Sequence, residues 1–320
     1  MRGRVLDQRS PPRQRRARAS LTPRTRVVGR SMLARSIGVA SSEREDAYMT
    51  DNLTATGDQP AVRTLDTTVP QTARIWNHLL GGKDNYAADR AVGDQIIKSL
   101  PQLAENARLS RAYLVRAVRY LADEAGIRQF LDVGTGLPTA ENTHEVAQAV
   151  APESRIVYVD NDPLVLVHAR ALLTSSPEGA TDYIEADLRD TATILREAAR
   201  TLDLGKPVAL ILMGILGHIE DDDEAKSIID SIMAGLPSGS YLAMYDGSDT
   251  SEAVTEAVRI WNISANPKYH LRSPERIARL FEGLDLVEPG VVSVTRWRPD
   301  TGSAALPDEI DQYCAVGRKP

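Results

Sequence analysis

Four residues at the ends of two predicted strands have the types and spacing needed to hold a nucleoside. One apolar run leads into Asp132, Gly134 and Gly136, and a second apolar run ends at Asp160. The two glycines let the backbone turn sharply and let a ligand come close, and the Asp160 carboxylate can accept hydrogen bonds from two ribose hydroxyls. This layout is typical of a nucleotide-binding crevice at the carboxyl edge of a parallel sheet.

The loop after the first strand discriminates between cofactors. A dinucleotide fingerprint has a third glycine three residues after the second, where a helix N-terminus receives a pyrophosphate, but this chain has Thr139 there. S-adenosylmethionine has no pyrophosphate, and its sulfonium cation is attracted by an acidic residue such as Asp132, which would repel a phosphate. The loop therefore favours S-adenosylmethionine over NAD. The alternative without a ligand is a plain strand-to-helix turn, with Asp160 as a helix cap.

Length and composition indicate a folded α/β protein. The chain has 320 residues, of which 42% are hydrophobic and 26% charged, enough for one α/β domain with extra segments. Its one cysteine, Cys314, excludes an internal disulfide framework. The longest apolar run, residues 208–219, is too short to cross a bilayer and contains glycines. We therefore expect a cytoplasmic protein without a membrane span.

The net charge of −6 conceals a basic N-terminus. Residues 1–35 contain eleven Arg and one Asp, about +10, so the rest of the chain carries about −16. We expect residues 1–70 to form a disordered arm and linker, because Pro and Arg at this density cannot bury enough surface to order it. The arm has three interpretations: a tail for nucleic acid or a membrane surface, an organellar presequence, or sequence upstream of a true start at Met49, which we favour.

The remaining sequence predicts a helical cap followed by a Rossmann-like domain. Helical patterns indicate a cap over residues 71–127, and residues 128–320 then alternate strands and helices, which is typical of a parallel sheet. A polar loop before the last strand suits a hairpin, so we expect seven strands with an antiparallel last one. The expected strands are 130–134, 156–160, 183–187, 208–214, 240–246, 284–292 and 312–318.

Several segments resemble the actinobacterial S-adenosyl methyltransferase family. They are RIWNHLLGGKDNYAADR (74–90), QFLDVGTGLPTAENTHEVAQ (129–148), IVYVDNDP (156–163), ADLRD (186–190), LPSGSYLA (236–243), and FEGLDLVEPGVV with WRPD (281–300). The resemblance covers residues 72–318. It implies a class I methyltransferase fold with S-adenosylmethionine lying across the strand ends.

The resemblance also implies the residues that hold the cofactor. The loop under the methionine portion would be Asp132, Gly134, Thr135 and Gly136, the ribose would lie on Asp160 and Asn161, and the adenine would be bordered by Asp187 and Leu188. An N-terminal signature would act as a lid and contains Gly82, Lys83, Asn85 and Tyr86. The Gly-Gly pair by itself suits a closing segment, or equally a helix C-cap and turn.

Three positions depart from the family pattern. Residues 216–218 read Leu-Gly-His where relatives often read Leu-His-Phe, and residues 245–247 read Tyr-Asp-Gly where relatives often carry a Ser-His pair. Ser110 replaces a usual asparagine. The first two positions follow strands and would face the methyl acceptor. We therefore expect the acceptor to differ from that of relatives, or the acceptor pocket to have lost its chemistry.

Methyl transfer from a sulfonium is an in-line displacement, so positioning and desolvation of the nucleophile can supply most of the catalysis without a metal. The candidate catalytic residues are His218, which could act as a general base, and Asp246 and Tyr245, which could orient a hydroxyl or an amine. The alternative for His218 is an ordinary helix-start residue before the acidic run 220–223.

The expected acceptor is a small molecule. A body of about −16 repels nucleic acid, and Cys314 lies in a predicted strand, where a small buried side chain explains it better than a nucleophile does. Three functions stay open on these residues: a small-molecule methyltransferase, a binding protein for S-adenosylmethionine or S-adenosylhomocysteine without catalysis, and an NAD-dependent oxidoreductase. The sequence does not indicate an oligomeric state.

Overall fold

The fold is built on a sheet whose parallel strands all end at one edge. The computed structural model describes residues 66–138, 141–172, 174–300 and 306–320. Within these residues the strand order is β3-β2-β1-β4-β5-β8-β6, and β7 pairs with β8. Strands β1 to β5 are parallel, and β8 is antiparallel to β5. The chain runs from β1 outward to β3 and then crosses to β4, so β1 and β4 flank a topological switch point.

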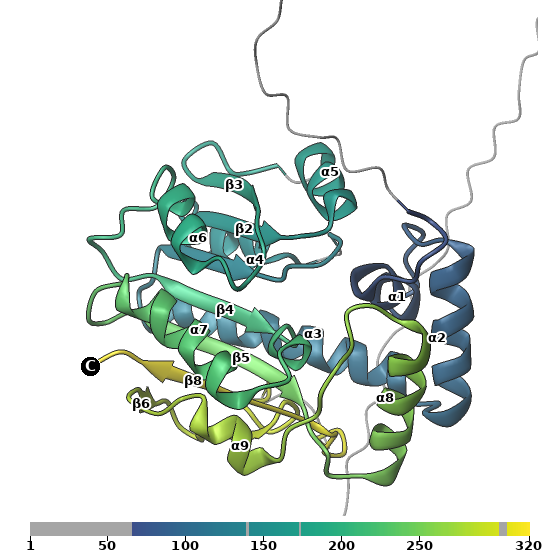
Figure 1. Ribbon diagram of the computed structural model, residues 1–320. Helices are drawn as coiled ribbons and strands as arrows, with labels where there is room; N and C mark the ends of the chain where they lie inside the picture. The colour runs from purple at the N-terminus through teal and green to yellow at the C-terminus, as the bar shows by residue number, and fades with distance from the viewer. Residues whose placement is uncertain (1–65, 139–140, 173, 301–305) are drawn as a thin grey trace, which may run out of the picture. The chain divides into compact units, whose positions relative to one another are not determined.

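Helices cover both faces of this sheet, which is why the central strands are apolar throughout. The parallel strands are β1 (Gln129–Val133), β2 (Arg155–Asp160), β3 (Ala180–Glu185), β4 (Ala209–Met213) and β5 (Tyr241–Gly247). Every residue of β1 and of β5 is buried. One face packs on α3 (Leu103–Asp123) and α4 (Thr143–Val150), and the other on α6 (Thr191–Ala198), α7 (Asp222–Ala234) and α9 (Pro274–Arg279) (Figure 1). Helix α5 (Pro163–Leu172) contacts β2 and β3.

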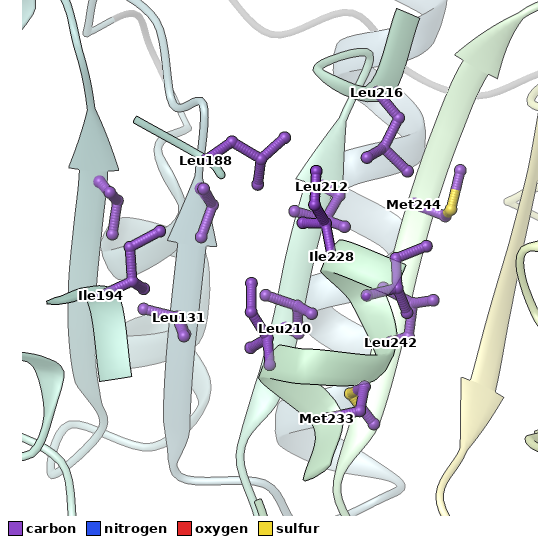
Figure 2. Packing of buried hydrophobic residues seen from close by; sticks show 14 of the residues in the cluster. Leu131, Leu188, Ile194, Leu210, Leu212, Leu216, Ile228, Met233, Leu242 and Met244 are labelled. Carbon is purple, nitrogen blue, oxygen red and sulfur yellow. The ribbon is translucent and has the colours of Figure 1, made fainter. Parts of the chain in front are cut away.

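Apolar side chains pack the sheet against the helices on one of its faces. Figure 2 shows Ile194 of α6 and Ile228 and Met233 of α7 in one cluster with Leu210 and Leu242 of the sheet. Burying each such side chain contributes about 1.5–3 kcal/mol relative to leaving it in water. This packing holds α6 and α7 on that face of the sheet.

The C-terminal strands differ in one respect from the prediction. The single strand expected over residues 284–292 is two short strands, β6 (Asp285–Leu286) and β7 (Val292–Ser293), both antiparallel to β8 (Gln312–Arg318). The break contains Pro289, which has no N–H to donate, and Gly290, which has φ +84°. The described sheet therefore has eight strands rather than seven, and the antiparallel last strand is confirmed.

Three helices form a cap with its own apolar core. They are α1 (Thr72–Leu79), α2 (Ala87–Ser99) and α8 (Glu252–Ser264). The core consists of Ile75, Leu79, Val92, Ile96, Leu100, Val254, Ala257, Ile260, Trp261 and Ala265. Figure 1 shows α8 beside α2, although the sequence assigned α8 to the sheet domain rather than to the cap over residues 71–127. The cap thus combines helices from both ends of the chain.

Residues 1–65 of the expected arm, with the favoured start at Met49, lie outside the described residues, whereas residues 66–70 are described. None of the helices in the described ranges combines the length and the apolar character needed to cross a membrane.

Candidate active site

A cavity of about 650 Å³ lies at the carboxyl ends of the parallel strands. It is lined by residues that follow β1, β2, β3 and β4, by the end of β5, and by side chains of α1, α3 and α8. This volume is in the usual range for small-molecule and cofactor sites, and the location matches the switch point of the sheet. Among the described residues, no three His, Cys, Asp or Glu side chains are grouped so that they could hold a metal ion.

The loop after β1 requires its two glycines. Gly134 and Gly136 have φ of +74° and +65°, a backbone conformation that side chains with a Cβ rarely adopt. A Cβ on Gly134 would also lie 2.5 Å from Cγ1 of Ile215, which follows β4. Gly134 therefore permits both the turn and the close approach of the two segments that flank the switch point.

Asp160, at the end of β2, holds this loop in place. Its Oδ2 accepts a hydrogen bond from the backbone N–H of Gly136 (2.9 Å), and its Oδ1 accepts one from the N–H of Asp162 (2.9 Å). Burial raises the pKa of Asp160 to about 6, and these two N–H donors oppose the increase. Each oxygen keeps a further lone pair, so the carboxylate can order the loop and still accept from a ligand.

Asp132 is a second buried carboxyl at the cavity. Its Oδ2 accepts a hydrogen bond from the Thr143 hydroxyl (2.6 Å). Burial raises the pKa of Asp132 to about 6, opposed by the Thr143 hydrogen bond and by the positive charge of Arg111. Two carboxyls at one loop give this part of the cavity a negative potential above about pH 6.

The other predicted cofactor residues that follow the strands line the same cavity. They are Thr135, Asn161, Asp187 and Leu188. Asp187 is exposed, and its Oδ1 accepts from the N–H of Arg189 (2.9 Å), whereas Leu188 is buried in the core beneath α7. The structure thus brings the predicted residues after β1, β2 and β3 to one surface.

The predicted lid residues lie elsewhere. Gly82, Lys83 and Tyr86 do not line the cavity, and the first two are exposed. The backbone N–H of Tyr86 donates to Asp89 Oδ2 (2.8 Å) at the start of α2, and its ring lies 5.4 Å from the Arg74 guanidinium carbon. These contacts belong to the packing of the cap.

The turn around Gly82 is organised by Asn77 of α1, which does line the cavity. Asn77 Oδ1 accepts from the backbone N–H of Asp84 (3.0 Å) and from Asn85 Nδ2 (2.9 Å). A Cβ on Gly82 would lie 2.4 Å from Asn77 Nδ2. The residues of this signature therefore hold the Asn77 side chain from outside the cavity. They do not cover the cavity.

His218 lines the cavity with a defined tautomer. It ends a 3₁₀ turn, η1 (Leu216–His218), and its Nδ1 lies 2.7 Å from the carbonyl oxygen of Lys268. Because a carbonyl only accepts, Nδ1 carries the proton, and in the neutral ring Nε2 is left with a lone pair. Burial lowers the pKa of His218, which favours this neutral form.

Tyr245, the second catalytic candidate, also lines the cavity. Burial raises the pKa of its phenol, and its side chain hydrogen-bonds with Ser110 of α3. The phenol therefore keeps its proton at neutral pH and acts as a hydrogen-bonding group rather than as a base.

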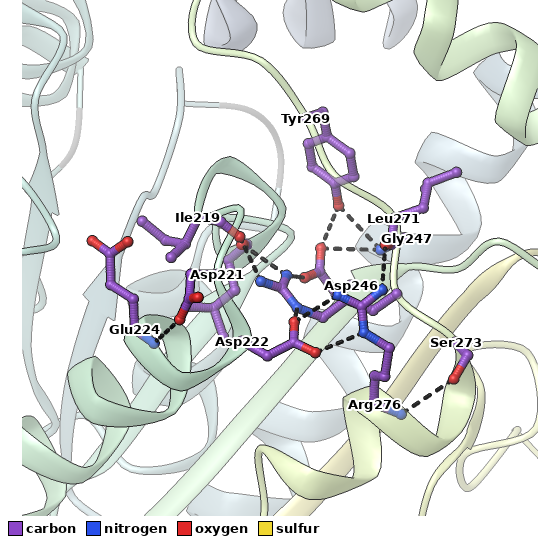
Figure 3. A network of polar contacts seen from close by, with 12 residues as sticks. Ile219, Asp221, Asp222, Glu224, Asp246, Gly247, Tyr269, Leu271, Ser273 and Arg276 are labelled. Carbon is purple, nitrogen blue, oxygen red and sulfur yellow. Dashed lines mark hydrogen bonds and ion pairs between the residues drawn. The ribbon is translucent and has the colours of Figure 1, made fainter.

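Asp246, the third candidate, does not line the cavity. Figure 3 shows the polar contacts that hold it. Its Oδ2 accepts from Arg272 Nη1 at 2.9 Å, and both side chains are fully buried. Its Oδ1 accepts from the Tyr269 hydroxyl and from the N–H of Gly247 (3.0 Å). Burial raises the pKa of Asp246, and Arg272 opposes the increase. This carboxylate is held by three donors behind the cavity wall.

Arg272 joins this carboxylate to the start of α7. Its Nε donates to Asp222 Oδ1 (2.8 Å), and its Nη1 donates to the carbonyl of Leu216 (2.9 Å). A further bond runs from Nη2 to the carbonyl of Ile219, and Asp222 also accepts from Arg276 Nε (2.6 Å). The network in Figure 3 therefore fixes η1, and with it His218, relative to β5.

Arg74 is a buried cation at the cavity that was not predicted from the sequence. Arg74 of α1 donates to the carbonyls of Asp66 and Val69 (3.1 Å each), and its Nε lies 4.0 Å from Asp162 Oδ2. Neither that Nε nor that Oδ2 has a hydrogen-bond partner in the described structure. The signal in the sequence that could have found Arg74 was its position next to Ile75, on an apolar face of a predicted helix.

Two aromatic residues at the cavity were also missed. Trp261 of α8 is 7% exposed, and its indole N–H is buried without a partner in the described structure. Tyr269 lies in the segment after α8 and packs edge-on against His218, with ring centroids 5.2 Å apart. Both are distant in sequence from the glycine loop, and no local pattern marks them.

Comparisons with known proteins are consistent with this arrangement. The family described as S-adenosyl methyltransferase matches residues 58–320. A solved DUF574 family protein from Streptomyces avermitilis is 48% identical, with a TM-score of 0.76 over 80% of this chain and 99% of that chain. A Thermobifida fusca protein, whose description proposes a methyltransferase, is 44% identical, with a TM-score of 0.73 over 79% and 96%. No curated protein matches the chain.

Proposed function

The chain belongs to the S-adenosyl methyltransferase family, and from this premise we propose that it methylates a small molecule bound in the cavity beneath the helical cap. The enzyme class and the cofactor follow from the family, so an NAD-dependent oxidoreductase is not retained. The observation that supports a small-molecule acceptor is the position of the cavity. It is bordered by the strand ends, by the three cap helices α1, α2 and α8, and by α3. Such a site suits a molecule that the cap can surround.

The residues around the β1 loop fit S-adenosylmethionine. Asp160 retains acceptor capacity for the two ribose hydroxyls while it orders Gly136. Asp132 supplies negative charge for a ligand that carries an ammonium and a sulfonium. Leu188 offers an apolar edge beside Asp187 for the adenine. When bound, the cofactor supplies an electrophilic methyl group.

The residues after β4 and β5 fit the acceptor. His218 Nε2 has the lone pair to take a proton from the acceptor, since Nδ1 is committed to Lys268. Tyr245 remains protonated and can hydrogen-bond to the same molecule. Asp246 is a positioning residue, because it holds Tyr269 and, through Arg272, the turn that carries His218. Excluding water from this wall favours methyl transfer by desolvating the nucleophile.

Incubation with S-adenosylmethionine and metabolite fractions tests this function. We expect the low-molecular-weight fraction of an actinobacterial extract to stimulate S-adenosylhomocysteine formation, with one product gaining the mass of a methylene. Asp160→Asn should reduce this formation by about tenfold or more, because charge-assisted bonds to the ribose weaken. Glu185→Gln is the matched control, since Glu185 pairs with Asp160 across β2 and β3 but lies outside the cavity. Stimulation only by protein or nucleic-acid fractions would contradict the proposal.

A further inference from the structure

The cavity divides into two parts by strand order. The ends of β2 and β3 lie on one side of β1, and the ends of β4 and β5 lie on the other. The proposed cofactor residues Asp160 and Asp187 belong to the first side. The second side, together with α3 and α8, forms what we call the acceptor arm, which rests on the proposed function.

We propose that the acceptor arm takes a neutral, largely apolar molecule whose methylated atom is a hydroxyl oxygen. The apolar and aromatic side chains that line the arm from α3, α8 and the segment after α8 are Leu103, Ala107, Leu114, Val258, Trp261 and Tyr269. The neutral polar side chains Asn106, Ser110, Asn266 and Gln312 line it as well. A charged group placed against these side chains would lose its hydration without gaining a partner, which costs several kcal/mol in general.

The carboxylates near the arm are already bound by other groups. Asp311 lines the arm, but its two oxygens accept from the hydroxyls of Thr250 (2.5 Å) and Ser251 (2.9 Å). Asp246 lies behind the wall, paired with Arg272. An acceptor that carries an ammonium group would therefore have to share Asp311 with these two hydroxyls.

The cations that line the cavity are also directed elsewhere. Arg74 binds backbone carbonyls in the segment before α1 and approaches Asp162, which follows β2. Arg111 donates to the Glu141 carbonyl and to Asn142 Oδ1, both just before α4. Arg189 pairs with Glu224 at 2.6 Å on the β3 side. The charge of Arg111 also acts on the buried carboxyl of Asp132 and on the Tyr245 phenol. A carboxylate or phosphate on the acceptor would therefore have to compete with Asp132 for this cation.

A hydroxyl matches the polar groups that the arm does present. His218 Nε2 can accept one proton, whereas the Tyr245 phenol can donate a hydrogen bond. In the step, an oxygen lone pair forms the O–CH₃ bond and the C–S bond breaks with its electron pair passing to sulfur. The hydroxyl proton passes to His218 Nε2, so that a neutral thioether, a methyl ether and an imidazolium result. The unpartnered indole N–H of Trp261 marks where a second oxygen of the acceptor could bind.

Binding of matched probes tests the inference independently of turnover. Calorimetry on the full chain saturated with S-adenosylhomocysteine would compare 2-naphthol with 2-naphthoate, and 4-butylphenol with 4-butylbenzoate. Each pair has similar size and differs in charge. Val258→Glu places a carboxylate in the arm, and Ile263→Glu is the control, because Ile263 lies on the same helix, is 67% exposed and does not line the cavity.

We expect each hydroxyl compound to bind at least about tenfold more tightly than its carboxylate partner, because the cations that line the cavity are bound by other groups and do not replace the lost hydration. Val258→Glu should weaken 2-naphthol binding by about tenfold or more and leave S-adenosylhomocysteine affinity within about twofold, and Ile263→Glu should change neither. Equal binding of the two members of each pair, no binding by either phenol, or full 2-naphthol affinity in Val258→Glu would overturn the inference. Failure of the unaltered protein to bind S-adenosylhomocysteine would instead contradict the proposed function.

Discussion

The ring of Tyr269 occupies the space that a side chain at Gly217 would need, since a Cβ there would lie 2.2 Å from the Tyr269 Cζ. The same ring also lies against Gly247, where a Cβ would be 3.0 Å from Cε1. Its hydroxyl then reaches Asp246. The Tyr269 side chain thus packs between the turn that follows β4 and the end of β5.

This relationship connects the two departures from the family pattern. Gly217 and Gly247 belong to the two segments, 216–218 and 245–247, for which the resemblance implies a departure from the family pattern. Both glycines make room for Tyr269. The two segments therefore pack on the same aromatic side chain and form one part of the cavity wall.

Gly217→Ala should destabilise the protein, because the added methyl group overlaps the Tyr269 ring and forces it to move. We expect the free energy of unfolding in urea to fall by about 1–3 kcal/mol. Gly205→Ala is the control, since Gly205 is exposed and its Cβ would approach only the Asp203 side chain, at 3.2 Å. Equal stability of Gly217→Ala and the unaltered protein would show that Tyr269 does not occupy this space.

The Asp246–Arg272 pair should contribute strongly to stability. Asp246→Asn leaves Arg272 buried with one carboxylate fewer, so we expect the free energy of unfolding to fall by about 3 kcal/mol or more. Glu256→Gln, which breaks the exposed pair with Arg259, should leave stability unchanged. Similar losses in the two variants would mean that the Asp246 pair is not buried as described.

The parts of the site that the sequence predicted are local in the chain. Gly134, Gly136 and Asp160 sit at strand ends, and parallel strands bring their carboxyl ends to one edge whatever the details of packing. The same rule placed His218 and Tyr245 at the cavity. The fold class followed from the alternation of strands and helices, and the antiparallel last strand followed from the polar loop that suits a hairpin.

The parts that the sequence could not predict depend on contacts between distant segments. Asp246 was expected to face the acceptor, but Arg272 and Tyr269 bind it from a segment more than twenty residues later. Trp261 reaches the cavity only because α8 packs on α2. Gly82 was read as part of a lid, whereas its neighbour in space is Asn77. No periodicity or spacing encodes these pairings.

Acid should weaken cofactor binding, whereas the same two buried carboxyls, taken by themselves, stabilise the ligand-free protein at low pH. The pKa values of Asp132 and Asp160 rise from 3.8 to about 6 on folding. Their contribution to the free energy of unfolding is therefore present below about pH 4 and is lost as pH rises through about 6. A cationic ligand prefers the ionised carboxyls, so its affinity should rise over the same interval.

Calorimetry between about pH 4.5 and about 8 would measure how the ligand affinity changes with pH, and urea unfolding would measure how the free energy of unfolding changes over the same range. We expect S-adenosylmethionine affinity to increase with pH, and we expect Asp160→Asn to reduce that dependence. Affinity that is flat across this range in the unaltered protein would mean that neither carboxyl contacts the cationic ligand.

The tautomer of His218 can be read directly by NMR. Because Nδ1 donates to the Lys268 carbonyl, we expect its ¹⁵N shift to be that of a protonated ring nitrogen and Nε2 to show a lone pair at neutral pH. His218→Gln assigns the signals, and His270→Gln is the control, since His270 does not line the cavity. A proton on Nε2 at pH 7 would exclude His218 as the general base.

The most direct test of the central claim is calorimetric titration of the protein with S-adenosylmethionine, S-adenosylhomocysteine and NAD in parallel. We expect both sulfur ligands to bind and NAD not to bind, because the loop at Gly136 is ordered by Asp160 rather than shaped for a pyrophosphate. Binding of NAD, or of none of the three, would contradict the assignment of residues 132–160 to S-adenosylmethionine.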